Sequence, residues 1–123
     1  MFLVDGISDR PWSGITKAAY GTADAYCAAC VIDENQPGAP KAKDRCKLPV
    51  YEPPSMGGLL NRRGVRAAAA RLVRTKGGVE APQSMKVDAA RRLLQLYARL
   101  GERPPVTPVT LAGSEHPSLQ LGL

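Results

Sequence analysis

Three cysteines are the residues of this chain whose types and spacing come closest to a chemical site. Two alanines separate Cys27 from Cys30, and Cys46 follows a lysine-rich stretch. Cysteines two residues apart chelate zinc well because the intervening turn brings their sulfurs together, but a structural zinc site needs four ligands. The only histidine, His116, lies about seventy positions further on. We therefore expect no metal and no cofactor, with zinc at Cys27, Cys30 and Cys46 as the alternative.

These cysteines are expected to be reduced. Cys27 and Cys30 lie in an alanine-rich run with helical character, where a free cysteine behaves as a small apolar side chain. A redox motif would instead place the first cysteine at a helix N-terminus, after a strand, where its pKa is lowered. An odd number of cysteines without a secretory signal also favours a reducing compartment.

No pattern typical of an enzyme accompanies the cysteines. The sequence contains no Gly-x-Ser-x-Gly elbow, Walker loop or glycine-rich dinucleotide fingerprint, and His116 stands near the end of the chain. Asp33 and Glu34 are adjacent carboxylates in a predicted loop, a position typical of turn formers. We therefore predict a non-enzymatic protein that works by binding other macromolecules.

Positive charge is concentrated in one half of the chain. The sequence has 17 Lys+Arg against 11 Asp+Glu, a net charge of +6, and residues 61–100 hold ten of the basic residues but only two acidic ones. An arginine-rich helical face can meet nucleic acid, an acidic protein surface or water. Our alternative function is therefore a small basic nucleic-acid-binding or regulatory protein, and its candidate face consists of Arg62, Arg63, Arg66, Arg71 and Arg74.

Three helices are predicted to carry these residues. Thr22 caps the first, which should continue through Ile32, and Asn61 caps the second, which should end near Lys76 before Gly77-Gly78. The third should start at residues 82–84 and end at Gly101; its apolar stripe is Val87, Ala90, Leu93, Leu94, Tyr97 and Leu100. We expect Leu72 and Leu94 to lie in the core.

The rest of the chain is expected to be extended. Residues 46–54 contain three prolines, so they should form an edge strand or a polyproline-like segment over the helices. The predicted fold class is mainly α, with a three-helix core, this proline-rich extended segment, and extended N- and C-terminal arms. The predicted organisation is an N-terminal arm at 1–17, a helical domain at 18–103 and an extended C-terminal arm at 104–123.

Both arms carry apolar residues that suit contact with a partner. The candidate partner-binding residues are Trp12, Val106, Val109, Leu111, Leu119 and Leu121. Trp12 could instead plug the side of the helical core, and the C-terminal arm could be disordered or fold back on its own domain. No apolar run approaches the ~18–20 residues of a membrane span, so we expect no membrane contact.

Several short segments, in their order along the chain, resemble a small domain found in tailed-bacteriophage structural and head-morphogenesis proteins. They are Trp12, Ala29–Asp33, Lys47–Val50, Glu52-Pro53, Leu60–Arg62, Val65, Ala68-Ala69, Gly77–Val79 and Ala89–Tyr97 ahead of Pro104-Pro105. The likeness covers roughly residues 10–105, and its motifs are short and non-chemical. In such phage proteins the domain often accompanies a prohead-protease or capsid-related region, and no catalytic residue is attributed to it.

The resemblance implies a minor structural protein of a bacteriophage virion, with a cement, decoration or other head-associated role. Its partners would be the major capsid protein or other virion proteins, and several copies would be present in the assembly. Such a protein would be located in the virion, and in the host cytoplasm during assembly. DNA stays open as a further partner because of the arginine face.

Overall fold

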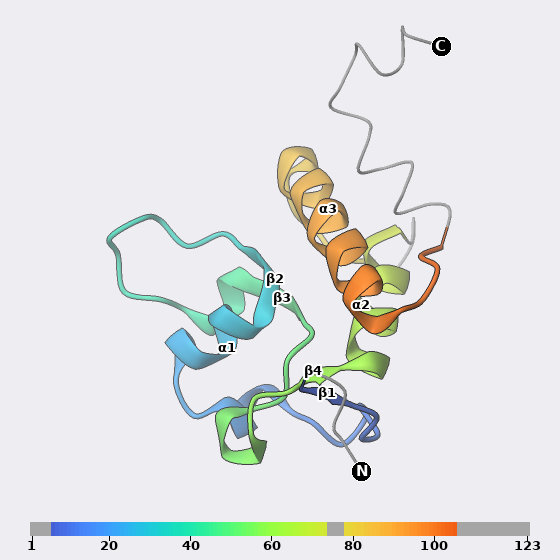
Figure 1. Cartoon of the computed structure of the whole chain (residues 1–123). Coiled ribbons are helices and arrows are strands. Elements are labelled where there is room, and N and C mark those ends of the chain that lie inside the picture. The colour runs from blue at the N-terminus through green and yellow to red at the C-terminus, as the bar shows by residue number, and fades with distance from the viewer. Residues whose placement is uncertain (1–5, 74–77, 106–123) are drawn as a thin grey trace, which may run out of the picture. The chain divides into compact units, whose positions relative to one another are not determined.

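The computed structural model describes residues 6–73 and 78–105 (Figure 1). The chain divides into two compact units, Met1–Ala68 and Ala69–Leu123. In the described ranges, two small two-stranded sheets accompany three α-helices, namely α1 (Ala23–Ala29), α2 (Arg62–Val73) and α3 (Gln83–Leu100). The prediction of three helices is confirmed, but the mainly α class is not, because the fold is mixed α/β.

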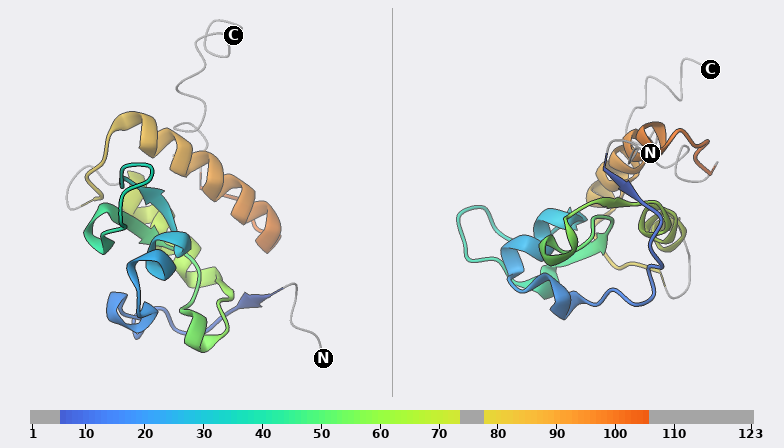
Figure 2. Two further views of the ribbon diagram at one scale, coloured as in Figure 1. Left: turned by 90° about the vertical axis from the view of Figure 1, so that its left-hand side faces the viewer. Right: turned by 60° about the horizontal axis from the view of Figure 1, so that its bottom comes forward.

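Both sheets belong to the first unit. Strands β2 (Cys30–Asp33) and β3 (Cys46–Pro49) are antiparallel, with Asp33 opposite Cys46, and the loop between them projects from the end of this ladder (Figures 1 and 2). Strands β1 (Ile7–Ser8) and β4 (Leu60–Asn61) are parallel. Short 3₁₀ turns complete the unit at Lys17–Tyr20, Lys43–Arg45 and Pro54–Met56.

Helix α1 begins as predicted but ends earlier. The Thr22 hydroxyl oxygen accepts a hydrogen bond from the Ala25 N–H at 3.1 Å, which confirms the predicted cap. Cys30 then takes an extended backbone (φ −95°, ψ 152°), and Val31 and Ile32 continue as β2 rather than as helix. Both side chains are β-branched, which favours a strand, and pairing with β3 supplies the backbone bonds that a longer helix would have made.

The proline-rich segment forms strand β3 over Cys46–Pro49, and a strand was one of the two structures expected for residues 46–54. Its prolines stand at the end of β3 or beyond it, where they remove few ladder hydrogen bonds. After β3, the Val50 N–H donates to the Ala29 carbonyl and the Asn61 N–H donates to the Val50 carbonyl, both at 2.9 Å. These two bonds connect the β2–β3 sheet to the start of α2.

In the second unit, α3 is the main described element (Figure 2). Its bounds match the prediction, and Val87, Leu93 and Tyr97 are buried on one side of it. Leu72 of α2 is also buried, as expected. The prediction for Leu94 is wrong: this side chain is only partly buried. It lies about 100° around the helix from Leu93, which places it at the edge of the buried stripe.

Glycine is required at the C-terminal end of α3. Gly101 has φ 73°, a left-handed conformation, and its N–H bonds the Ala98 carbonyl while the Glu102 N–H bonds the Tyr97 carbonyl. This is the Schellman arrangement, which satisfies the last free carbonyls of a helix. We expect Gly101→Ala to lower the free energy of unfolding by about 1–2 kcal/mol, because a Cβ is unfavourable at this φ. Urea denaturation measures the loss, and no change would show that the helix end relaxes into another conformation.

Candidate functional site

A buried polar network at the start of α2 holds the N-terminal segment in place. The Asn61 side-chain oxygen accepts a hydrogen bond from the Gly64 N–H at 2.8 Å, which confirms the predicted cap of α2. Its amide nitrogen donates to the Arg10 carbonyl at 2.9 Å and to the Glu52 carboxylate at 2.8 Å. One fully buried amide therefore connects the start of α2, the chain at Arg10 and the segment after β3.

Glu52 is the buried charge of this network. Its side chain has no exposed surface, and one carboxylate oxygen bonds Asn61. The other oxygen makes no hydrogen bond, but it lies 3.4 Å from the Arg10 Nε, so it is compensated by an ion pair of imperfect geometry. Because a buried carboxylate needs such partners, this glutamate has a structural role in the network.

Trp12 packs on the same junction. A Cβ built on Gly64 would come within 3.0 Å of the Trp12 ring, so the indole lies directly over the first turn of α2. The ring is partly buried. Trp12 therefore has a packing role inside the first unit, and its predicted role in partner binding stays a prediction. The other candidate partner residues, Val106, Val109, Leu111, Leu119 and Leu121, lie outside the described residues.

The arginines of α2 differ in what they contact. Arg62 forms an ion pair with Asp9, at 2.7 Å between Nε and the carboxylate, and so adds to the junction. Arg63 and Arg66 are exposed in the first unit. Val65 and Ala68, on another side of the helix, are buried, so α2 is amphipathic. Arg71 is exposed in the second unit, and Arg74 lies outside the described residues.

The cysteines depart from the expectation of free thiols. Cys27 and Cys46 form a disulfide, and Cys30 is the free, buried cysteine. The sequence separates the bonded pair by 19 positions, and only the antiparallel pairing of β2 with β3 brings Cys46 beside the end of α1. Cys27 lies in α1 and Cys30 begins β2, and Cys30 takes no part in the disulfide.

Cys30 has no reactive character. Burial raises the pKa of its thiol to about 12, because it outweighs a hydrogen bond with Tyr26 that lowers this pKa, and the nearby Asp33 charge raises the pKa further. The thiol therefore stays protonated at neutral pH and is a poor nucleophile. Burial likewise raises the pKa of Tyr20 to about 12, and its hydroxyl donates to the Tyr51 carbonyl at 2.5 Å. Both groups serve the core of the first unit.

Asp33 and Asn35 stand beside the disulfide, and the sequence analysis gave neither a chemical role. The Asn35 amide nitrogen lies 3.2 Å from the Cys46 sulfur and 3.6 Å from the Cys27 sulfur. It also donates to the Asp33 carboxylate at 2.8 Å. Burial alone raises the pKa of Asp33, but hydrogen bonds from Lys41 and Asn35 outweigh it and hold that pKa below its usual value. The available signal was the run Asp33-Glu34-Asn35, which was interpreted only as a turn.

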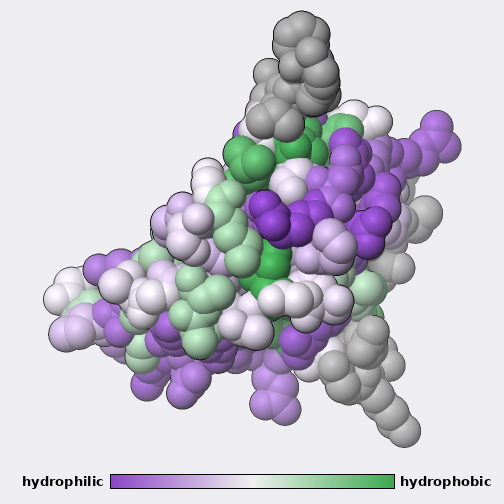
Figure 3. Space-filling view, turned by 90° about the horizontal axis from the view of Figure 1, so that it is seen from below, coloured by the Kyte–Doolittle hydropathy of each residue, from purple (hydrophilic) through white to green (hydrophobic). Residues whose placement is uncertain are grey.

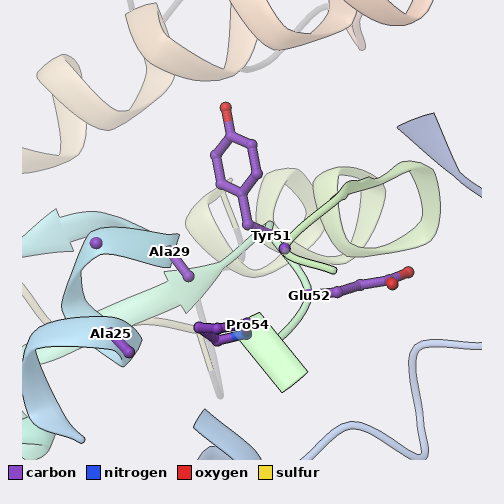
Figure 4. Close-up of a pocket in the computed structure, with 7 residues that line it drawn as sticks. Ala25, Ala29, Tyr51, Glu52 and Pro54 are labelled. Carbon is purple, nitrogen blue, oxygen red and sulfur yellow. The ribbon is translucent and has the colours of Figure 1, made fainter. Parts of the chain in front are cut away.

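An open pocket of about 400 Å³ lies beside α1 in the first unit (Figure 4). Ala25, Ala29, Tyr51 and Pro54 give it an apolar lining. Glu52 also borders it, but its side chain points away from the alanines. The pocket therefore offers a shallow apolar surface without an available charged side chain among these residues.

On the face drawn in Figure 3, hydrophilic residues occupy broad areas and strongly hydrophobic residues are confined to smaller ones. Among the described residues, no helix is both long and apolar enough to span a membrane.

No protein-family model matches the chain, and comparisons with curated proteins and with solved structures return no match.

Proposed function

We propose that this chain is a non-catalytic binding protein that serves as a minor structural component of a tailed-bacteriophage head. It would attach to the major capsid protein or to another virion protein, in a cement, decoration or other head-associated role. The proposal rests on the sequence resemblance to the phage head-morphogenesis domain. It also rests on the contacts that the residues carrying this resemblance make in the folded chain.

The supporting observation is that these residues meet at one junction. Trp12 covers Gly64, Glu52 is bonded by Asn61, and Leu60 pairs with Ile7. Residues from three separate motifs thus build one folded unit. This is expected of a structural domain, in which the residues that recur in the family stabilise the fold and do not take part in a reaction.

The chemistry of the buried groups also favours binding over catalysis. Glu52 is enclosed, and the free thiol of Cys30 is protonated at neutral pH because its pKa is raised to about 12. Neither group has the exposure and ionisation that a nucleophile or general base requires. A protein that works by attachment needs no such group.

Attachment is tested by sedimentation with particles of the phage whose genome carries this sequence. We expect the full chain to sediment with capsids at a fixed ratio to the capsid protein. A chain truncated after Pro105 should keep its helical circular dichroism but lose attachment, because an extended proline-containing arm binds a neighbour with little loss of entropy. Failure of the full chain to sediment with either proheads or mature heads contradicts the proposal.

DNA binding is the second candidate, and exposed Arg63 and Arg66 favour it. The matched variant replaces these two arginines by alanine and leaves Arg62, because its ion pair with Asp9 helps to hold the N-terminal segment. If the arginines contact phosphates, affinity for duplex DNA falls steeply with salt, and the double variant loses most of it. Submicromolar affinity at physiological salt that the double variant abolishes would place this function ahead of capsid attachment.

A further inference from the structure

One end of the β2–β3 sheet gathers three side chains that can bind a metal ion. The sulfurs of Cys27 and Cys46 and a carboxylate oxygen of Asp33 lie within 4.8 Å of one another. Asp33 and Cys46 are direct partners in the ladder, and Cys27 is in the last turn of α1. The three potential ligands therefore come from three elements that the fold itself brings together, and Cys30 is not among them.

We propose that reduction of the Cys27–Cys46 disulfide creates a zinc site from two thiolates and the Asp33 carboxylate, with water in the fourth position. A dithiol reductant gives two electrons and two protons to the disulfide and is itself oxidised to a disulfide. The products are the two thiols of this chain. Zinc then replaces the two thiol protons, which pass to solvent.

The geometry of the cluster suits this exchange. Once the S–S bond is broken, the two sulfurs must move apart to a non-bonded distance. Tetrahedral zinc, with Zn–S bonds of about 2.3 Å, holds two sulfurs roughly 3.8 Å apart. Cys46 follows the loop between β2 and β3, and the Cys27 sulfur lies 3.8 Å from the carbonyl oxygen of Ala42 in that loop, so a small shift of the loop accommodates the ion without changing the strand pairing.

Two residues beside these ligands, Asn35 and Lys41, can stabilise the ligands in their charged forms. The Asn35 amide nitrogen is directed at both sulfurs and at Asp33, while its oxygen accepts from the Ala42 N–H at 2.8 Å and so fixes the orientation of the amide. N–H groups directed at sulfur stabilise the thiolate. Lys41, paired with Asp33, offsets part of the negative charge that two thiolates and a carboxylate bring together.

The ligand set selects the class of metal. Two thiolates with one carboxylate favour a borderline-soft ion such as zinc over magnesium or calcium, which bind oxygen ligands. Both cysteines are buried, which limits competition from water. Asp33 is partly exposed and gives the ion a path from solvent.

The test uses the full chain, reduced by a phosphine under nitrogen and titrated with cobalt(II). We expect one cobalt per chain with a thiolate-to-cobalt charge-transfer band, displacement by one equivalent of zinc, and no band for the oxidised protein. The Cys46→Ser variant should lose the band, whereas Cys30→Ala, the matched control, should keep it. A reduced protein without a band, or a band lost only in Cys30→Ala, overturns the proposal.

A second variant keeps the test decisive if Cys46→Ser fails to fold, which circular dichroism reveals. Asp33→Asn retains both thiols but removes the anionic oxygen. We expect its cobalt affinity to fall by at least about tenfold, since even outer-shell partners of metal ligands have effects of that size. Equal affinity in Asp33→Asn removes the carboxylate from the site and contradicts the proposed ligand set.

Discussion

Replacement of Asn61 by alanine is expected to lower the free energy of unfolding by about 3–5 kcal/mol. The change removes the cap of α2, which is worth about 1 kcal/mol. It also removes the donor to the partly buried Arg10 carbonyl and the donor to one oxygen of the fully buried Glu52 carboxylate. An unsatisfied buried group costs about 1–3 kcal/mol, and more if it is charged. Urea denaturation followed by circular dichroism measures the loss.

The Asn61→Asp variant keeps the helix cap but removes the hydrogen bonds that Asn61 donates, so it measures their contribution separately. Its carboxylate still accepts from the Gly64 N–H, but it donates no hydrogen bond and stands beside Glu52. Two ionised carboxylates buried side by side repel each other, and neither offers a hydrogen to the other. The free energy of unfolding of Asn61→Asp at neutral pH should therefore fall below that of the natural chain.

The control for both variants is Arg63→Ala, on the exposed side of the same helix. It should change the free energy of unfolding by less than about 0.5 kcal/mol. If Asn61→Ala behaves like this control, the network is not formed in solution. If Asn61→Asp is as stable as the natural chain at neutral pH, Glu52 is not buried beside it.

The second large effect is expected at Leu93. This side chain has no exposed surface, so Leu93→Ala should cost about 2–5 kcal/mol through lost burial and the cavity left behind. Leu94→Ala is the matched comparison, because the same group is deleted one position along the same helix from a partly exposed site. It should cost less than about 2 kcal/mol. A larger loss for Leu94 than for Leu93 in urea denaturation would mean that α3 buries a different face.

The sequence was sufficient wherever local interactions decide the structure. Thr22 and Asn61 cap helices because their side chains reach N–H groups three residues away, and Gly101 ends α3 because it tolerates a positive φ. The periodicity of α3 gave its bounds and most of its buried face for the same reason. These features depend on neighbours within about one helical turn.

Tertiary structure decided the features that depend on residues far apart in the chain. The end of α1 at Ala29 depends on a strand that lies beyond a loop, so helical composition alone extended the helix to Ile32. Leu48 has φ 63° immediately before a proline, a conformation that its residue type disfavours and that the surrounding strand must impose.

The candidate site has the same origin. Asp33 and Cys46 are opposite each other only because β2 and β3 pair, and this pairing also brings Cys46 to Cys27 rather than Cys30. From their local pattern the cysteines were expected to be free thiols, because a local pattern contains no information on strand register. Register is fixed by which side chains become buried when the whole unit folds, and that choice placed the sulfurs and the carboxylate together.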